Sequence, residues 1–446
     1  MPVNKNMNPE AKKFIEDDVE LIDKEEWKEL ALKACNKIGK DGVNTLQKIL
    51  KDASIEIDGL EKYISQYYST FPRIHQIKCY NVGFGDCFLC KGENEYNPKM
   101  LVDFGARKVD KSVIKNVIDE LSKTDKKYLM LSHLHEDHYR GLKNVKAKRD
   151  KQHLKFDEIY LPDYIASGGI EFMGEVLLST RNNTLLNLVR TILEIPALLS
   201  GYVKKDTKVY LLCQNNVVHN SLCNFEVLLP LKNNRFSINH RGDLEELIGS
   251  FVQRYINLLN YDPYSNGETS SIQVYSNNLG EEIDHLIYDL IQEGQEIDVS
   301  VDEKKLKNRF DNYHNSLSLA FHELSVSDYE NVLFLGDAET TDIDALVKNG
   351  KLANQYCFVK VQHHGTKNHF YNALPTAKYY AITNGGRRVG WKLTSDYNYC
   401  YGGNTTFICS NSCNCELIMH SVPCQSKNKN NATCGIIPPS KTINIP

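Results

Sequence analysis

The sequence predicts a layered α/β fold. This prediction rests on two groups of short apolar strands, on helical segments between and outside them, and on histidines placed where a strand ends. The strands are short apolar or alternating runs bounded by glycine. The first group reads IHQIKCYNVG, CFLC, KMLVDFG, YLMLSHLH and EIYLPD between residues 74 and 163, followed by KVYLLC and FEVLLP, and the second reads NSLSLAFHEL, NVLFLGDAE, CFVKVQHHG and YYAITNGG.

Three further segments have the apolar spacing of helices or an irregular pattern. Residues 9–68 are rich in Lys and Glu with apolar residues at helical spacing, and they predict an α-helical N-terminal module over 1–72. The helical period from 170 to 199, and LEELIGSFVQRYINLL and EEIDHLIYDLI within a helical insertion at about 232–310, predict helices in the second domain. That domain is expected to span 73–446 and to end in a cysteine-rich segment at 400–446.

Composition excludes several classes of protein. The 446 residues are 41% hydrophobic and 25% charged, which is typical of a globular chain and not of a collagen-like or disordered one. Fifty-three basic and fifty-seven acidic residues give a net charge of -4, so binding to nucleic acid or anionic lipid would have to be local. The first residues, MPVNKNMNPEAKKF, contain no apolar run, and Arg190, Glu194 and Pro196 interrupt the most lipid-like stretch. We therefore expect a cytoplasmic protein that does not contact membranes.

The 13 cysteines are unevenly distributed, because six of them fall in the last 47 residues. Cys409, Cys413 and Cys415 form C-x3-C-x-C, which differs from the C-x2-C spacing of zinc ribbons. A cytosolic chain keeps its thiols reduced. We expect buried reduced thiols in terminal strands and neither a disulfide framework nor a structural zinc site.

The segment LSHLHEDHYRG holds His133, His135, Asp137 and His138. His133 and His135 follow a strand and, at positions i and i+2, point to the same side of an extended backbone. Isolated histidines are mostly surface or core residues. Here three of the chain's 14 histidines lie within six positions beside an aspartate, which favours metal binding.

Two other strand ends offer further ligands. Asp337 follows the apolar run NVLFL and a glycine, and its two oxygens suit a bridge between two cations about 3.5–4 Å apart. His363 and His364 follow the run CFVKVQ. Together these residues predict a centre for two divalent cations.

Five pieces in this order resemble the metallo-β-lactamase superfamily, and specifically the branch of competence (DNA-uptake) proteins and phosphorylcholine esterases: VGFGDC (82–87), LVDFG (101–105), HLHEDH (133–138), LGD (335–337) and HHGT (363–366). The resemblance covers roughly residues 74–390. It implies an αββα sandwich with the metals at the strand ends on one edge. It also implies that His133 and His135 hold the first metal, that Asp137 and His138 hold the second, and that Asp337 bridges them.

The resemblance leaves several positions open. We expect His364 to be the last ligand and His363 to contact phosphate or donate a proton. Asp103 matches the carboxylate that orients a ligand histidine, whereas Asp86 has either the same role or that of a turn-forming residue. His314 precedes the apolar run that follows the insertion, and the sequence does not decide whether it reaches the site. Without it the first position would accept Mn as well as Zn.

Two cations that share a carboxylate lower the pKa of a bound water, so the expected reaction is hydrolysis by a metal-bound hydroxide. Asp137 is expected to orient the nucleophile and carry its proton. The candidates for the leaving-group proton are His363, Glu339 and a metal-bound water.

Basic residues near these motifs bear on the substrate. Lys146, Lys148 and Arg149 follow the histidine motif, and Arg387 and Arg388 follow ITNGG. They suit either a phosphate-binding surface or a solvated charged loop. The resemblance favours a phosphodiesterase, either a nuclease or a nucleotide phosphodiesterase. The alternatives are a lactonase or β-lactamase-type acyl hydrolase, and an interaction protein with a relict metal site. In that last alternative, the N-terminal helices and the insertion at 232–310 would be partner surfaces. For the hydrolase too, the N-terminal helices suit self-association or a protein partner.

Overall fold

The structure is a computed structural model that divides the chain into two compact units, Met1–Phe71 and Pro72–Pro446. Residues 1–71, and with them the predicted N-terminal module, lie outside the described residues, as do Arg387, Arg388 and most of the cysteine-rich segment. The structure describes residues 72–82, 84–94, 96–105, 111–180, 182–231, 242–263, 269–274, 278–296, 302–324, 331–383, 396–397, 405–410 and 440–445.

The described strands form two sheets. In spatial order the eight-stranded sheet contains β15 (Ser440–Asn444), β1 (Gln76–Tyr80), β2 (Cys87–Lys91), β3 (Lys99–Phe104), β4 (Lys127–Met130), β5 (Phe156–Pro162), β6 (Val203–Leu212) and β9 (Ser270–Ile272). The seven-stranded sheet contains β14 (Thr406–Cys409), β13 (Thr376–Ile382), β12 (Gln355–Lys360), β11 (Val332–Phe334), β10 (Ala320–Glu323), β8 (Asn224–Leu229) and β7 (Val217–His219).

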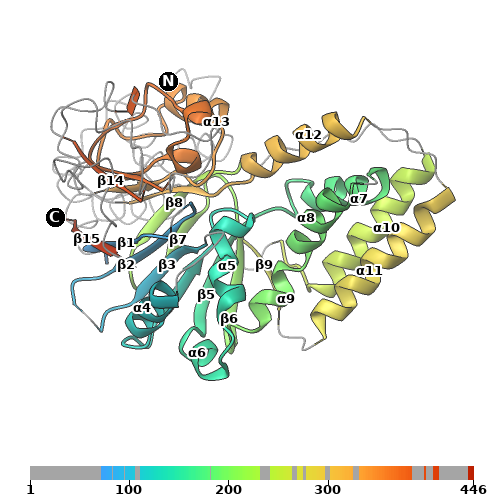
Figure 1. Cartoon of the computed structure of the whole chain (residues 1–446), viewed down its shortest axis with the longest axis horizontal. Helices are drawn as coiled ribbons and strands as arrows, with labels where there is room; N and C mark the ends of the chain where they lie inside the picture. Colours follow the sequence, from blue (N-terminus) through green and yellow to red (C-terminus); the bar gives the residue numbers. More distant parts are fainter. Residues whose placement is uncertain are drawn as a thin grey trace, which may run out of the picture. The chain divides into compact units, whose positions relative to one another are not determined.

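Helices cover the outer faces of both sheets (Figure 1). The described helices are α4 (Lys111–Leu121), α5 (Glu136–Asn144), α6 (Lys148–His153), α7 (Gly169–Ser179), α8 (Asn183–Leu193), α9 (Ile195–Ser200), α10 (Gly242–Leu258), α11 (Leu279–Glu293), α12 (Glu303–Ser316) and α13 (Thr340–Lys348), with the short 3-10 turns η1 (Gly294–Glu296), η2 (Gln362–Gly365) and η3 (Lys367–His369). In the described chain, no helix combines the length and apolar character needed to span a bilayer.

The alternation of side chains along the strands produces the layers. In β2, Phe88 and Cys90 join the apolar core between the two sheets, whereas Cys87 and Leu89 join the core under the helices of the first sheet. A third core packs the outer face of the second sheet against α13. This order of layers, helix, sheet, sheet and helix, is an αββα sandwich, which confirms the predicted fold class.

The insertion is helical, as predicted, and its described part consists mainly of α10, α11 and α12, together with the short strand β9 on the edge of the first sheet. Asp302 caps α12 by accepting hydrogen bonds from two backbone N–H groups in its first turn. One prediction was wrong in detail. The helical insertion was expected to end at about 310 and the next strand to begin at Asn315, but α12 continues to Ser316, because the buried Leu306, Phe310 and Tyr313 have helical spacing.

The described cysteines Cys79, Cys87, Cys90, Cys213, Cys223 and Cys357 are buried free thiols. Of the six cysteines in the terminal segment 400–446, the structure describes only the backbone of Cys409, in β14.

Parallel pairing brings strand ends together. Strands β3, β4, β5 and β6 run parallel to one another in the first sheet, and β11, β12, β13 and β14 do so in the second. Residues that follow the carboxyl ends of neighbouring parallel strands therefore meet at one edge of the sandwich.

Candidate metal centre

The first sheet positions its ligands through a close contact between β3 and α5. A Cβ atom on Gly105 would lie 2.0 Å from the carbonyl oxygen of Asp137 and 2.2 Å from the amide nitrogen of His138, so only glycine fits there. The same loops are tied by the Asp86 N–H, which donates to the Asp137 carbonyl at 3.1 Å. The start of α5 is therefore held against the end of β3, with Asp137 and His138 in its first turn.

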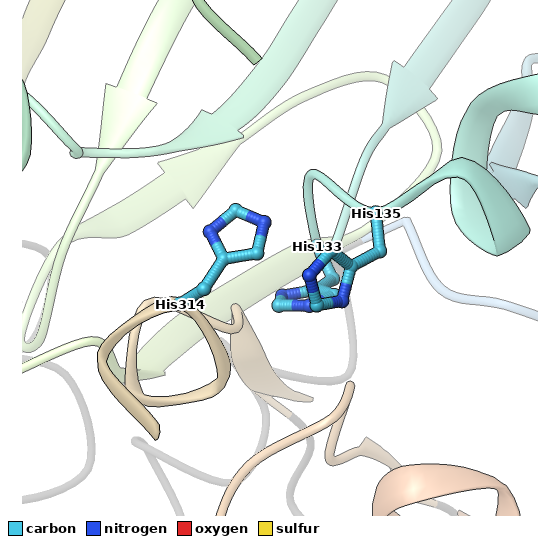
Figure 2. Close-up of side chains that lie close together, drawn as sticks. All are labelled: His133, His135 and His314. Carbon is cyan, nitrogen blue, oxygen red and sulfur yellow. The ribbon is translucent and has the colours of Figure 1, made fainter. Parts of the chain in front are cut away.

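A group of three histidines forms the first potential ligand set, His133, His135 and His314 (Figure 2). His314 projects from the end of α12, and its ring centroid lies 4.4 Å from that of His133 and 4.2 Å from that of His135. The Nε2 of His133 faces the Nδ1 of His135 at 2.7 Å. The structure thus answers the question that the sequence left open, since His314 does reach the site.

The histidines of this group are suited to binding a cation. Burial lowers the pKa of His133 and of His314 well below the usual value, so both rings are neutral at pH 7 and keep a free lone pair. The Nδ1 of His133 lies 3.1 Å from the Ser318 hydroxyl, which leaves its Nε2 directed at His135. Ser318 therefore fixes the orientation of this ring.

The second potential ligand set is Asp137, His138 and His364. The Nε2 of His364 lies 3.4 Å from an Asp137 oxygen. The Oδ2 of Asp337 lies 3.3 Å from the Nε2 of His138 and 3.3 Å from the Nε2 of His364. The structure therefore brings together all six residues that the sequence predicted as ligands, counting His133 and His135 in the first set.

The charges of this second set are strongly coupled. Burial alone would lower the pKa of His138, but Asp337 and Asp103 outweigh it and raise that pKa to about 10. Asp337 and Asp86 likewise overcome burial and raise the pKa of His364 well above its usual value. In turn, the nearby histidines hold the pKa of Asp137 and of Asp337 low. Without a cation, these histidines hold protons that balance the carboxylates.

The residues present fit metal ions. Within each three-residue set the ligand atoms lie within 4.8 Å of one another. The buried Nε2 atoms of His138 and His364 face a carboxylate without hydrogen-bond geometry. Histidine nitrogens and carboxylate oxygens gathered in this way are the donors that zinc and manganese accept.

The two adjacent histidines after β12 have different surroundings. Both lie in the left-handed region, with φ of 44° for His363 and 57° for His364, which is uncommon for residues other than glycine. The kink directs His364 into the second ligand set. His363 instead stacks on His369, with ring centroids 3.6 Å apart and an interplanar angle of 6°.

His363, His369 and Glu339 form a further polar group beside the two ligand sets. The Glu339 carboxylate accepts from the Asn315 amide at 2.6 Å and lies 3.6 Å from the Nε2 of His369. Because the two histidine rings are parallel, an ion in the plane of one ring would lie outside the plane of the other. This group suits contact with a substrate better than a third metal ion.

Asp103 and Asp86 both contact ligand histidines. Asp103 accepts from the Ser132 N–H at 2.7 Å and the Ser132 hydroxyl at 2.5 Å, and its Oδ2 lies 3.0 Å from the Nδ1 of His138. Asp86 accepts from the Thr383 hydroxyl at 2.5 Å, and its Oδ1 lies 3.3 Å from the Nδ1 of His364. Asp86 therefore contacts a ligand histidine, and its role is not limited to forming a turn.

Sequence reasoning missed Lys360, the last residue of β12. It is buried, and its ammonium lies 2.5 Å from Asp86 Oδ2 and 3.5 Å from Asp337 Oδ1. The available signal was a lysine inside the otherwise apolar run CFVKV. Sequence reasoning also missed the hydroxyls of Ser132, Ser318 and Thr383, which no motif distinguishes.

The structure does not bring Lys146, Lys148 and Arg149 to this site. Lys148 and Arg149 begin α6, and Lys146 lies two residues before it. Helix α6 directly precedes β5, whereas the ligands follow the carboxyl ends of the parallel strands. Figure 1 shows α6 at the end of the first sheet opposite α12.

Comparisons with known proteins give little beyond this geometry. No family model matches the sequence, and no curated protein matches it. Among solved structures, the chain is similar to a long form RNase Z from yeast, with 12% identity and a TM-score of 0.26 over 69% of this chain. The match spans 37% of the yeast protein, little more than a third of its length. A TM-score this low carries no argument about activity.

Proposed function

We propose that this protein is a hydrolase that uses two divalent metal ions, Zn or Mn, to cleave phosphodiester bonds. The observation that carries the proposal is the presence of two adjacent ligand sets connected by Asp337. The carboxylate of Asp337 faces His138 and His364 of the second set. Its backbone N–H donates to the Ser318 hydroxyl, which also contacts His133 of the first set.

Individual side chains have separate roles in the proposed reaction. Bound here, two divalent ions would lower the pKa of a water molecule and offset the charge that develops on a phosphoryl oxygen. Asp137 orients the attacking water and accepts its proton, because its carboxylate is partly exposed beside His364. Asp103 fixes the ring of His138, and Ser318 fixes the ring of His133.

The group of Glu339, His363 and His369 is assigned to the leaving-group side. Asn315, the residue after His314, holds one oxygen of Glu339. His363 stacks on His369 next to the ligand His364. A hydrogen-bonding group at this place can contact the substrate phosphate or supply a proton to the departing oxygen.

The choice of a phosphodiester rests on the resemblance of five sequence motifs to the competence protein and phosphorylcholine esterase branch. Within that class, a nuclease and a nucleotide phosphodiesterase remain the two proposals. The near-neutral net charge is compatible with both, because the metal ions supply positive charge at the site itself. We also propose a cytoplasmic location and self-association through the N-terminal helices.

The test combines metal content with a panel of substrates. Purified protein should contain two Zn or Mn ions per chain by mass spectrometry, and it should hydrolyse bis(p-nitrophenyl) phosphate or nucleic acid. His135→Ala and Asp337→Asn should lose hydrolysis and at least one ion. Asp157→Asn is a matched control, because Asp157 bonds the Lys127 N–H at the opposite edge of the first sheet.

Two outcomes would favour other functions. Faster turnover of a lactone or a cephalosporin than of the phosphate diester would identify an acyl hydrolase. Biological function that survives Asp337→Ala would identify an interaction protein with a relict site.

A further inference from the structure

Lys360 is a buried cation among metal-ligand residues. Its side chain is 2% exposed, and its ammonium donates to the Gly336 carbonyl oxygen at 2.7 Å and pairs with Asp86 Oδ2 at 2.5 Å. The third neighbour is Asp337 Oδ1 at 3.5 Å. An ammonium has three N–H donors, so three acceptors surround it here. A buried charge is costly unless it is paired in this way, which indicates a specific role for lysine at this position.

The contacts of Lys360 reach two proposed ligands of the second metal. On one side, Lys360 holds Oδ1 of Asp337, and Oδ2 then faces His138 and His364. On the other side, Lys360 holds Oδ2 of Asp86, whose Oδ1 faces the Nδ1 of His364. One ammonium thereby orients a carboxylate directly and an imidazole through Asp86.

The net charge of the cluster also supports a specific role for Lys360. Four buried or partly buried carboxylates lie in this cluster, from Asp86, Asp103, Asp137 and Asp337. With Lys360 they carry three net negative charges when the histidines are neutral. Two divalent cations carry four positive charges and would nearly balance them. Without Lys360, the cluster would carry one more uncompensated negative charge in a site with little access to water.

We propose that Lys360 is a positioning residue that directs Asp337 Oδ2 and His364 Nε2 toward the second metal ion. The proposal rests on the dinuclear site of the proposed function. The three-histidine set has no contact with Lys360 among the interactions described above. Loss of the ammonium should therefore lower the affinity for the second metal ion and leave the affinity for the first unchanged.

The experiment measures metal binding by the full-length protein and does not depend on activity. Metal-free Lys360→Met protein would be titrated with Zn²⁺ or Mn²⁺ against a chromophoric chelator. We expect one ion to bind as in wild type and the second to bind at least about tenfold more weakly, the scale seen when a partner of a metal ligand is removed. Lys360→Gln, which keeps a polar end without the charge, should show the same selective loss.

Lys99→Met is the matched control. Lys99 is also fully buried, and its ammonium donates to the Glu120 carbonyl oxygen at 2.7 Å near the start of β3, away from the ligands. Its loss should lower thermal stability and leave both metal affinities unchanged.

Several results would overturn the proposal. The first is a second-ion affinity within twofold of wild type in the folded Lys360 variants. The second is an equal loss of both ions. The third is full recovery of the affinity for the second ion in the double variant Asp86→Asn with Lys360→Met, which would mean that Lys360 only neutralises Asp86. A wild-type protein that binds fewer than two ions would instead refute the proposed function, and the Lys360 proposal with it.

Discussion

Replacement of Asp103 by Asn tests how the second metal position is held. Asp103 has a positive φ of 56°, which Asn tolerates, and the two side chains have nearly the same shape. The Ser132 N–H donates to Oδ1, so the amide oxygen of Asn should take that place. The amide NH2 would then face the Nδ1 of His138, where a carboxylate oxygen now lies at 3.0 Å.

The size of the effect follows from the tautomer of His138. When His138 is neutral, as metal binding requires, Nδ1–H donates to Asp103 and the lone pair is on Nε2, the atom that faces Asp337. An amide donor at Nδ1 would move the proton to Nε2 and remove the lone pair that binds metal. Loss of such an orienting partner typically weakens metal binding by about 10–100-fold. This corresponds to about 1.4–2.7 kcal/mol in the free energy of binding the second ion.

The assay is a competition titration of metal-free protein with a chromophoric chelator, with Asp157→Asn as the control far from the site. We expect the control to match wild type and Asp103→Asn to lose affinity for one ion only. If Asp103→Asn bound both ions with affinities within twofold of wild type, the orienting role of Asp103 would be refuted.

Three further predictions address other parts of the site. His314→Ala should lower the affinity for the first metal ion by more than about 100-fold, since it removes a ligand and not only an orienting partner. The absorption spectrum of the cobalt-substituted protein reports the loss of this ligand, and an unchanged spectrum would contradict the prediction. In metal-free protein the pKa of His138 is raised to about 10, above the value of about 6.5 in the unfolded chain. Its proton therefore stabilises the fold fully below about pH 6.5, and this stabilisation is lost as the pH rises toward 10. Calorimetry should therefore show a melting temperature that falls across this range, less steeply in His138→Gln. Gly105→Ala should cost about 1–3 kcal/mol or more and disturb metal binding, because its Cβ would overlap Asp137 and His138. Gly249→Ala in α10, where no atom lies within 4 Å of the added Cβ, should instead stabilise by about 0.5–1 kcal/mol in denaturant titrations.

Much of the fold was predictable because it depends on local patterns. Runs such as CFLC and KMLVDF alternate between two apolar environments, and the structure has strands there with one face between the sheets and one under helices. The pairing of distant segments was less accessible. Strand β15, the short β9 and the helical end at His314 depend on contacts far along the chain.

The ligands at strand ends were predictable from spacing and from the resemblance, whereas their neighbours in space were not. Lys360 and Ser318 reach the site only through the pairing of distant strands. Lys148 and Arg149 show the converse limit, because residues close to His138 in sequence need not lie close to it in space. The nine residues of α5, at about 1.5 Å each, carry the chain away from the ligands before these basic residues occur.

The most direct test of the central claim is a crystal structure of protein reconstituted with zinc or manganese, with anomalous scattering recorded at the metal edge. We predict two peaks a few ångströms apart, one about 2.0–2.2 Å from nitrogens of His133, His135 and His314, and the other bound by Asp137, His138 and His364. Asp337 should contact both. A single peak, or two peaks without Asp337 between them, would contradict the proposed dinuclear centre.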